Sequence, residues 1–182
     1  MRGLDQVTAR IIVLSGERGI GKSTVCRKTV ALAQAKGYIC GGILTLRRPG
    51  DALDVLDVHS GSVRQLTLEP DVSPAVIQGR FRFDPQALSW GNDVLAHATP
   101  CDLLIVDEIG PLEIEQDWGW QQAFDVLHQS DFALALVVIR PELIVAAQIR
   151  LSSSATAVFT VTNQNRDSLP AALLEMLEQE LE

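Results

Sequence analysis

A run of apolar residues near the start of the chain leads directly into a glycine-rich segment. Arg10–Ser15 is almost entirely apolar, which is typical of a strand buried on both faces. The next residues, Gly16-Glu17-Arg18-Gly19-Ile20-Gly21-Lys22-Ser23, fit the pattern G-x-x-x-x-G-K-[ST] without deviation. A helix is expected from Lys22 to about Ala35, ending at Gly37. This order of strand, glycine loop and helix constrains the fold more than any other feature.

The loop has the chemistry of a phosphate site. Its glycines let successive backbone N–H groups point inward at phosphate oxygens, and the helix N-terminus that follows favours anions. Lys22 is expected to reach the β- and γ-phosphates, the Ser23 hydroxyl to ligate Mg²⁺, and Thr24 to bond the α-phosphate. The alternative is a plain glycine turn with an exposed lysine. The residues predicted to bind the triphosphate are Gly16, Glu17, Arg18, Gly19, Ile20, Gly21, Lys22, Ser23 and Thr24.

Two acidic residues, Asp107 and Glu108, stand at the end of a second buried strand, which is predicted at Asp102–Asp107. A phosphate loop of this kind needs an acidic residue that holds magnesium at the end of a neighbouring strand, and Asp107 supplies it, through a water molecule. Glu108 comes next, where a carboxylate can polarise the attacking water, so we expect it to be the general base. The alternative role for Glu108 is a cap or a salt bridge within a loop.

The remaining pattern alternates strands with helices, which predicts a three-layer α/β/α fold with a mainly parallel sheet. Ser60-Gly61 predicts a hairpin between Leu53–His59 and Val63–Leu68, a small antiparallel addition to that sheet. Further strands are expected at Tyr38–Leu46, Phe132–Ile139 and Thr156–Val161, a loop or short helix at Asp71–Gly79, and helices that start at Asp84-Pro85, at Trp118 (to Gln129), at Pro141 (to near Arg150) and at Asp167 (to about Leu181).

Composition limits the classes of protein that remain. The 182 residues suit one domain, 1–182, with residues 1–9 as a tail, and 47% hydrophobic residues exclude a disordered chain. No apolar run is long enough to cross a bilayer and Met1–Arg10 lacks the features of a signal peptide, so we expect a cytoplasmic protein without a membrane partner. The net charge of −8 makes a nucleic-acid partner unfavourable. The three cysteines are expected to be reduced and buried.

At Asp107-Glu108-Ile109-Gly110-Pro111-Leu112-Glu113 the sequence resembles the D-E-I-G-x-M-E signature of a P-loop nucleoside-triphosphatase family. This family includes the thermophilic nucleotide phosphohydrolases and the human cancer-related nucleoside-triphosphatase. Three more segments agree in order, so the resemblance covers about residues 10–181. They are Gly41–Thr45, similar to G-G-F-x-T, Gly79–Asp84, similar to G-x-Y-x-V-D, and Val161–Asp167, similar to V-T-x-x-N-R-D.

The resemblance implies a P-loop fold with an extra strand between the P-loop strand and the strand that carries the magnesium aspartate. It also implies Mg²⁺-dependent hydrolysis of nucleoside triphosphates (ATP, GTP, CTP and UTP) to diphosphate and phosphate, with broad base tolerance. Asn165 and Arg166 would lie beside the base, although Arg166 also suits a solvated charge at a helix start. Glu113 would either support the site or be a surface carboxylate.

The chain departs from the family pattern at Leu46–Gly50, where an expected acidic residue is missing, and inside the P-loop, where Glu17 puts a negative charge near the γ-phosphate. Hydrolysis also commonly needs an arginine. Arg140 is the first candidate because it follows the Phe132–Ile139 strand at its carboxyl end. The alternative is a charge at the start of the next helix. The other candidates are Arg47, Arg48, Arg80, Arg82 and Arg150.

Other functions remain open at this level. A small-molecule kinase or ligase uses the same P-loop, and a nucleotide-switched module would act on a protein partner. Trp118 and Trp120 suit either a core position or a partner surface. A nucleic-acid motor is disfavoured by the net charge and by the small size of the chain.

Overall fold

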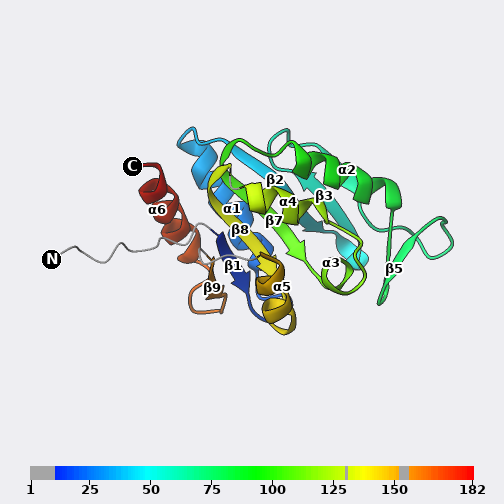
Figure 1. The fold of residues 1–182 in the computed structure, drawn as a ribbon. Coiled ribbons are helices and arrows are strands. Elements are labelled where there is room, and N and C mark those ends of the chain that lie inside the picture. Colours follow the sequence, from blue (N-terminus) through cyan, green and yellow to red (C-terminus); the bar gives the residue numbers. More distant parts are fainter. Residues whose placement is uncertain (1–10, 130, 152–155) are drawn as a thin grey trace.

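Residues 11–129, 131–151 and 156–182, which the computed structural model describes, form a seven-stranded sheet with helices on both faces (Figure 1). The predicted tail at 1–9 and Arg10, expected in the first strand, lie outside these residues. The strand order is β4-β3-β2-β7-β8-β1-β9. The strands are β1 (Ile11–Ser15), β2 (Cys40–Arg47), β3 (Leu53–Asp57), β4 (Val63–Gln65), β7 (Cys101–Ile109), β8 (Phe132–Ile139) and β9 (Thr156–Thr160).

Five of these strands are parallel, and the predicted hairpin, β3 and β4, continues the sheet in antiparallel pairing beside β2. Strand β8 lies between β1 and β7, so the extra strand that the resemblance implied is present. The predicted α/β/α class is therefore confirmed. Parallel strands all end at the same edge of a sheet, and the loops after β1, β7 and β8 meet there.

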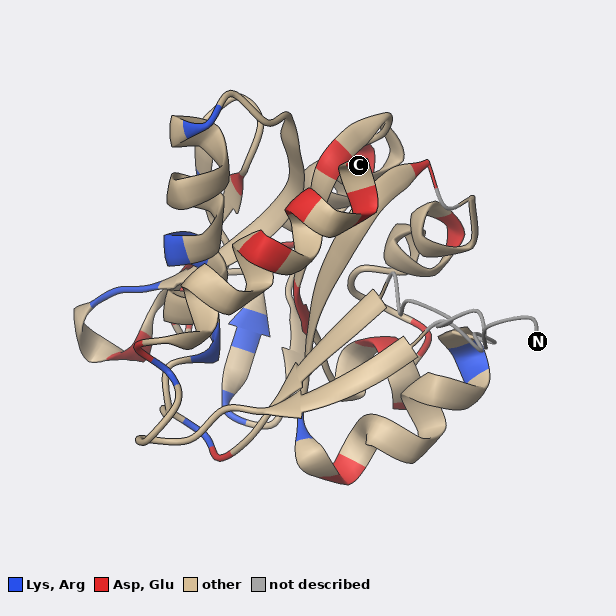
Figure 2. Ribbon diagram, turned by 90° about the vertical axis from the view of Figure 1, so that its left-hand side faces the viewer, with Lys and Arg blue, Asp and Glu red and all other residues tan. Residues whose placement is uncertain are grey.

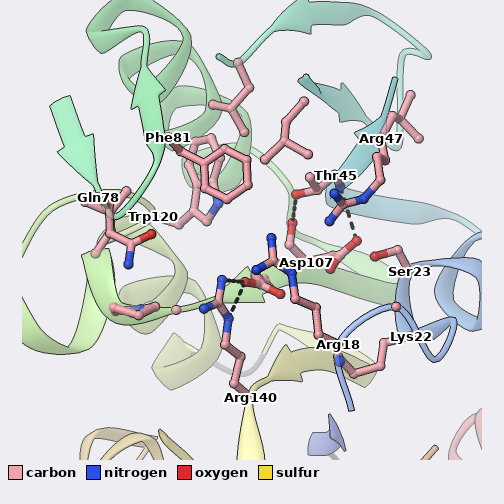
Figure 3. Close-up of a pocket in the computed structure, with 18 of the residues that line it drawn as sticks. Arg18, Lys22, Ser23, Thr45, Arg47, Gln78, Phe81, Asp107, Trp120 and Arg140 are labelled. Atoms are coloured by element: carbon pink, nitrogen blue, oxygen red, sulfur yellow. Dashed lines mark hydrogen bonds and ion pairs between the residues drawn. The ribbon is translucent and has the colours of Figure 1, made fainter. Parts of the chain in front are cut away.

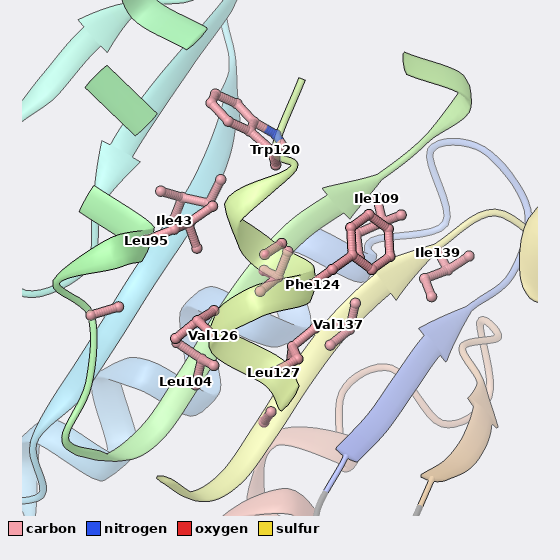
Figure 4. Packing of buried hydrophobic residues seen from close by; sticks show 14 of the residues in the cluster. Ile43, Leu95, Leu104, Ile109, Trp120, Phe124, Val126, Leu127, Val137 and Ile139 are labelled. Carbon is pink, nitrogen blue, oxygen red and sulfur yellow. The ribbon is translucent and has the colours of Figure 1, made fainter. Parts of the chain in front are cut away.

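Side chains that alternate along the central strands supply two separate cores. In β1, Ile12 and Leu14 face one helix layer, whereas Ile11 and Val13 face the other. This alternation makes the strand apolar at every position, as expected of a parallel sheet covered on both sides. The first layer contains α1 (Lys22–Ala35) and α6 (Leu169–Leu181), and the second, shown in Figure 4, contains α2 (Pro85–Ala96), α4 (Gln122–Gln129) and α5 (Ile144–Leu151).

The segment before α2 differs from the prediction of a loop or short helix at Asp71–Gly79. Its end forms β5 (Val76–Gln78), which pairs with β6 (Phe81–Phe83) as a second, two-stranded sheet. The β-branched and aromatic side chains favour extended backbone, and Gly79 (φ 57°) makes the tight turn. Short single-turn helices that were not predicted occur at Pro49–Asp51 and Pro111–Glu115 (α3). The helix predicted to start at Pro141 is present as a single turn, Pro141–Leu143, that leads directly into α5.

Two predicted helix starts were wrong. Helix α4 begins at Gln122 rather than Trp118, because the chain turns at Gly119, whose φ of 72° is incompatible with a helix. Asp167 does not cap α6, which starts at Leu169; the Asp167 carboxylate instead lies 3.5 Å from the Lys28 ammonium. By contrast, the predicted Asp84 cap is present, and its carboxylate accepts a hydrogen bond from the Gln86 N–H at 2.9 Å.

Helix α6 carries three acidic residues, Glu175, Glu178 and Glu180, and further acidic residues are distributed over the other elements (Figure 2). Cys26, Cys40 and Cys101 are free and buried, as predicted. Among the helices of the described residues, none combines the length and the apolar character that crossing a membrane requires.

Candidate functional site

The P-loop connects β1 to α1 and leaves its N–H groups open at the helix start. Gly16 (φ 138°) lies so close to the Val161 carbonyl that any side chain would collide with it, and Gly21 (φ 112°) precedes the helix in a left-handed conformation. Both positions therefore require glycine. The Lys22 ammonium is turned onto the loop itself and donates to the carbonyls of Gly16 (2.8 Å) and Glu17 (2.9 Å). Lys22 is 8% exposed, and this burial lowers its pKa.

Asp107 lies at the carboxyl end of β7 and is almost completely buried (1% exposed). The Thr45 N–H, on the neighbouring strand β2, donates to its carboxylate at 3.2 Å, and the Thr45 hydroxyl donates to its carbonyl at 2.6 Å. Burial, together with the negative charge of Glu108, raises the pKa of Asp107 to about 7, although the Ser23 hydroxyl and the Thr45 N–H oppose the shift.

The oxygen donors at this point suit a magnesium ion. Ser23 offers a hydroxyl and Asp107 a carboxylate, the hard oxygen ligands that Mg²⁺ prefers. Within the described part of the chain, Asp107 forms no ion pair with Lys or Arg, so its buried charge lacks a cation in contact. No three His, Cys, Asp or Glu side chains among the described residues form a metal cage. This pattern fits Mg²⁺, which keeps several waters and needs few protein ligands.

Glu108 and Arg140 face each other across the ends of β7 and β8. The guanidinium donates from both Nε (3.0 Å) and Nη2 (2.8 Å) to a single carboxylate oxygen, Glu108 Oε1. About one third of each side chain is exposed, so both groups remain open to the cleft (Figure 3). The salt bridge that was the alternative role for Glu108 is thus present, made with Arg140, the side chain expected to act on the phosphate.

These groups line one cleft of about 910 Å³ at the carboxyl edge of the sheet. Gly16, Arg18, Gly19, Gly21, Ser23 and Thr24 of the P-loop line it together with Lys22, Asp107, Glu108 and Arg140. Of the predicted loop residues, Glu17 and Ile20 do not line the cleft. Glu17 is exposed at the top of the loop and contributes its carbonyl to Lys22, whereas Ile20 packs against the core beside α1.

Asn165 and Arg166 lie outside this cleft, in the loop between β9 and α6. Asn165 uses its side chain to hold the loop, since Oδ1 accepts from the Thr162 N–H (2.8 Å) and Nδ2 donates to the Thr160 carbonyl (2.9 Å). The Arg166 side chain passes beside Gly21, next to the P-loop. The loop between β9 and α6 therefore lies beside the P-loop, at the start of α1.

The other arginine candidates are held by different partners. Arg47 pairs with Asp51 (2.6 Å) and Arg48 with Asp54 (3.0 Å), and both line the cleft. The remaining three, Arg80, Arg82 and Arg150, do not line it. Arg150 binds the carbonyl of Glu113 and covers the Phe124 ring at 3.8 Å. Arg140 is therefore the arginine that the structure places against Glu108.

Glu113 is buried (3% exposed) rather than a surface carboxylate. Its two oxygens accept from the N–H groups of Gly110 and Trp120, each at 2.8 Å, and burial raises its pKa to about 7. These bonds fix the turn that separates the two tryptophans. Trp120 (4% exposed) is a core residue that also reaches the cleft, whereas Trp118 (54% exposed) faces outward.

Several residues of the cleft were not identified from the sequence, among them Thr45, Gln78 and Phe81. Thr45 donates two hydrogen bonds to Asp107 and so holds it in place. The sequence did contain a pointer to this residue, because Thr45 ends the Gly41–Thr45 segment that resembles the family pattern. Gln78 and Phe81 come from the β5–β6 hairpin and form a wall opposite the P-loop (Figure 3). The sequence pointed to Arg80 and Arg82 of this hairpin rather than to Gln78 and Phe81, because which of its side chains face the cleft depends on tertiary packing.

Comparison with known proteins agrees with this geometry. The family model described as NTPase matches residues 11–174. A nucleoside-triphosphatase THEP1 of Methanopyrus kandleri is 30% identical over 176 residues, which cover 94% of this chain and 97% of the relative. One of Methanosarcina acetivorans is 30% identical over 165 residues, covering 87% of this chain and 91% of the relative.

Solved structures support the fold. A human cancer-related nucleoside triphosphatase superimposes with a TM-score of 0.72 at 23% identity, covering 94% of this chain and 98% of the other. The THEP1 structure of Aquifex aeolicus gives 0.70 at 18% identity, covering 92% and 99%. With the P-loop, the buried aspartate and these matches along nearly the whole chain, the protein belongs to the NTPase family of enzymes.

Proposed function

We propose that the protein hydrolyses nucleoside triphosphates to diphosphate and phosphate, with Mg²⁺ and with broad base tolerance. The supporting observation is the cleft itself, in which the P-loop, Asp107, Glu108 and Arg140 line one continuous space. A phosphate cradle, a metal carboxylate, a base and an arginine are the parts that phosphoryl transfer to water requires.

The P-loop provides the binding energy for the phosphates. In the structure, the Lys22 ammonium donates to the carbonyls of Gly16 and Glu17. On binding, its ammonium turns to the β- and γ-phosphates, while the loop N–H groups receive the phosphate oxygens. Ser23 and Asp107 would hold Mg²⁺, and the ion would neutralise charge that develops on the phosphate oxygens.

Glu108 and Arg140 then separate. The γ-phosphoryl group attracts the guanidinium, which releases the oxygen of Glu108 that it occupied. The freed carboxylate takes a proton from water as the water oxygen bonds to the γ-phosphorus and the bond to the bridging oxygen breaks. The diphosphate leaves with the electron pair of that bond.

Broad base tolerance is supported by the loop before α6. The Asn165 amide is engaged with the backbone at Thr160 and Thr162, so it is not free to read the edge of a base. Arg166 offers a long side chain beside Gly21, and its flat guanidinium stacks on any base in the same way. Contacts of this kind distinguish bases weakly.

A phosphate-release panel over ATP, GTP, CTP and UTP, with and without Mg²⁺, tests the proposal. We expect release from all four and none without the metal. Glu108→Gln should reduce turnover by roughly 10²–10⁴-fold, the usual contribution of a general base, while calorimetric binding of ATP changes little. Glu142→Gln, an exposed carboxylate in the same cleft, is the matched control and should keep full activity. Full activity of Glu108→Gln would remove Glu108 from the mechanism.

A further inference from the structure

The cleft extends well beyond the phosphate site, and its far end has a different chemistry. Apolar side chains from separate parts of the chain converge there, opposite the P-loop (Figure 3). Four of them are almost completely buried, with exposed fractions of 2–9%. This apolar chamber is lined by Leu53, Leu66, Phe81, Phe83, Leu88 and Trp120.

A triphosphate does not account for this space. The P-loop takes the phosphates, and the loop that is proposed to hold the base, with Asn165 and Arg166, does not line the cleft. At the position proposed for it above, beside Asn165 and Arg166, the base lies outside the cleft that contains the chamber. Ligand sites for small molecules measure about 300–1,000 Å³. At about 910 Å³ the cleft has room for a second molecule besides the phosphate chain.

The chamber also has the composition of a ligand site. Its walls include the rings of Phe81 and Trp120, and the amide of Gln78 stands at its side (Figure 3). The Arg18 guanidinium of the P-loop lies 5.9 Å from the centroid of the Phe81 ring. Asp54, the acidic residue beside Leu53 in the lining, is already paired with Arg48. Apolar walls with a few placed polar groups are typical of sites for uncharged organic molecules.

The reacting groups stand between the two ends. Glu108 and Arg140 line the same space as the P-loop and the chamber, and Glu108 Oε2 has no hydrogen-bond partner among the residues that the structure describes. A hydroxyl group carried by a molecule in the chamber would meet this free carboxylate oxygen, in the position where hydrolysis uses water.

We propose that the chamber binds a small, uncharged alcohol with a flat apolar body, and that the alcohol accepts the γ-phosphoryl group. Its oxygen bonds to the γ-phosphorus, its proton passes to Glu108, and the bond to the bridging oxygen breaks. The products are a phosphate monoester and the nucleoside diphosphate. When the chamber is empty, water takes the same place. This inference rests on the proposed nucleotide site.

Binding is tested on the full chain labelled with 5-fluorotryptophan, using ¹⁹F NMR and 2-phenylethanol as the probe. Trp120 lines the chamber, whereas Trp90 and Trp118 do not, so they serve as internal controls. With Mg²⁺ and a non-hydrolysable ATP analogue present, we expect the Trp120 signal alone to shift. Phe81→Ala should weaken the probe roughly tenfold, because a large part of its apolar contact is lost. A shift of all three tryptophan signals, or of none, would refute binding of the alcohol in the chamber.

Transfer is tested with γ-labelled ATP and the same alcohol, by separating labelled monoester from labelled phosphate. We expect monoester from the wild-type protein, roughly tenfold less from Phe81→Ala, and unchanged transfer from Trp118→Phe, the matched control outside the cleft. Phosphate release without any monoester, at alcohol concentrations that saturate the Trp120 shift, would refute the acceptor role. Failure of the ATP analogue to bind would instead refute the proposed nucleotide site.

Discussion

Replacement of Asp107 by Asn should stabilise the nucleotide-free protein. The carboxylate is 1% exposed, and its pKa is raised to about 7 from an ordinary value of 3.8. Between these two values the unfolded chain is ionised while the folded protein keeps a proton, so unfolding releases a proton. The stability of the wild type therefore falls as pH rises through this range, and becomes constant above about pH 7. Asn keeps the shape of the side chain and has no charge to desolvate.

The shift gives the size of the effect. At about 1.4 kcal/mol for each pKa unit, burial of Asp107 lowers the stability of the folded state by about 4 kcal/mol at pH 8, where the buried group is ionised, but by only about 1.5 kcal/mol at pH 5, where it keeps its proton. The difference in unfolding free energy between Asp107→Asn and the wild type should thus grow by about 2.5 kcal/mol over this range. Other titrating groups, such as Glu113, are present in both proteins and largely cancel in the comparison.

Urea denaturation at pH 5, 6, 7 and 8, with a chelator present, measures this difference. Asp93→Asn removes an exposed carboxylate and should give a constant offset. A second series adds Mg²⁺ and ATP, which should stabilise the wild type much more than Asp107→Asn, because the variant lacks the metal carboxylate. A difference that stays constant with pH would show that Asp107 is not held as a buried acid, and the argument from burial would fail.

Three more predictions follow from the same contacts. Arg140→Ala should lower the rate of single-turnover hydrolysis by roughly 10³–10⁵-fold with little change in ATP binding. Arg47→Ala and Arg48→Ala should hydrolyse ATP at close to the wild-type rate. An equal loss in all three variants would refute the assignment of Arg140 to the γ-phosphate. Gly91→Ala should lower the urea stability by about 1–3 kcal/mol, because the added methyl group meets the Trp120 ring; a gain of about 1 kcal/mol, the helix-propensity effect alone, would contradict the packing. Glu17→Gln should tighten ATP binding a few-fold at low salt and hardly at all at high salt, because salt screens this exposed charge. Calorimetry of ATP binding at two salt concentrations measures the effect. Equal gains in affinity at both concentrations would contradict a repulsion between Glu17 and the phosphates.

The parts of the site that were predictable depend on short stretches of sequence. The P-loop is one continuous motif, and Asp107 directly follows a buried apolar strand, so spacing alone placed both at the carboxyl edge of the sheet. The alternation of strands and helices predicted the mainly parallel sheet, and the family resemblance implied the extra strand that is β8. The complete order of the strands was not predicted.

The parts that were missed depend on contacts between distant residues. Strands β5 and β6 have three residues each, too short for a periodic pattern, and their role comes from where the hairpin packs. Trp118 and Trp120 are neighbours in sequence but differ in exposure, since Glu113 holds the Trp120 N–H and Gly91 leaves room for its ring. Likewise, six arginines were candidates until the fold placed Arg140 against Glu108.

Two of the regions that line the cleft differ in their place in the sheet. Residues 49–83, an insertion between β2 and α2, carry the hairpins that line one side, whereas β1, β7 and β8 carry the groups that act on phosphate. Neither hairpin contains one of the five parallel strands, because β3 and β4 add to the edge of the sheet in antiparallel pairing and β5 and β6 form a sheet of their own. Mutation can therefore reshape, shorten or replace either hairpin while the reacting groups keep their positions. Changes confined to residues 49–83 would therefore alter the shape of the cleft while the P-loop, Asp107, Glu108 and Arg140 keep their places.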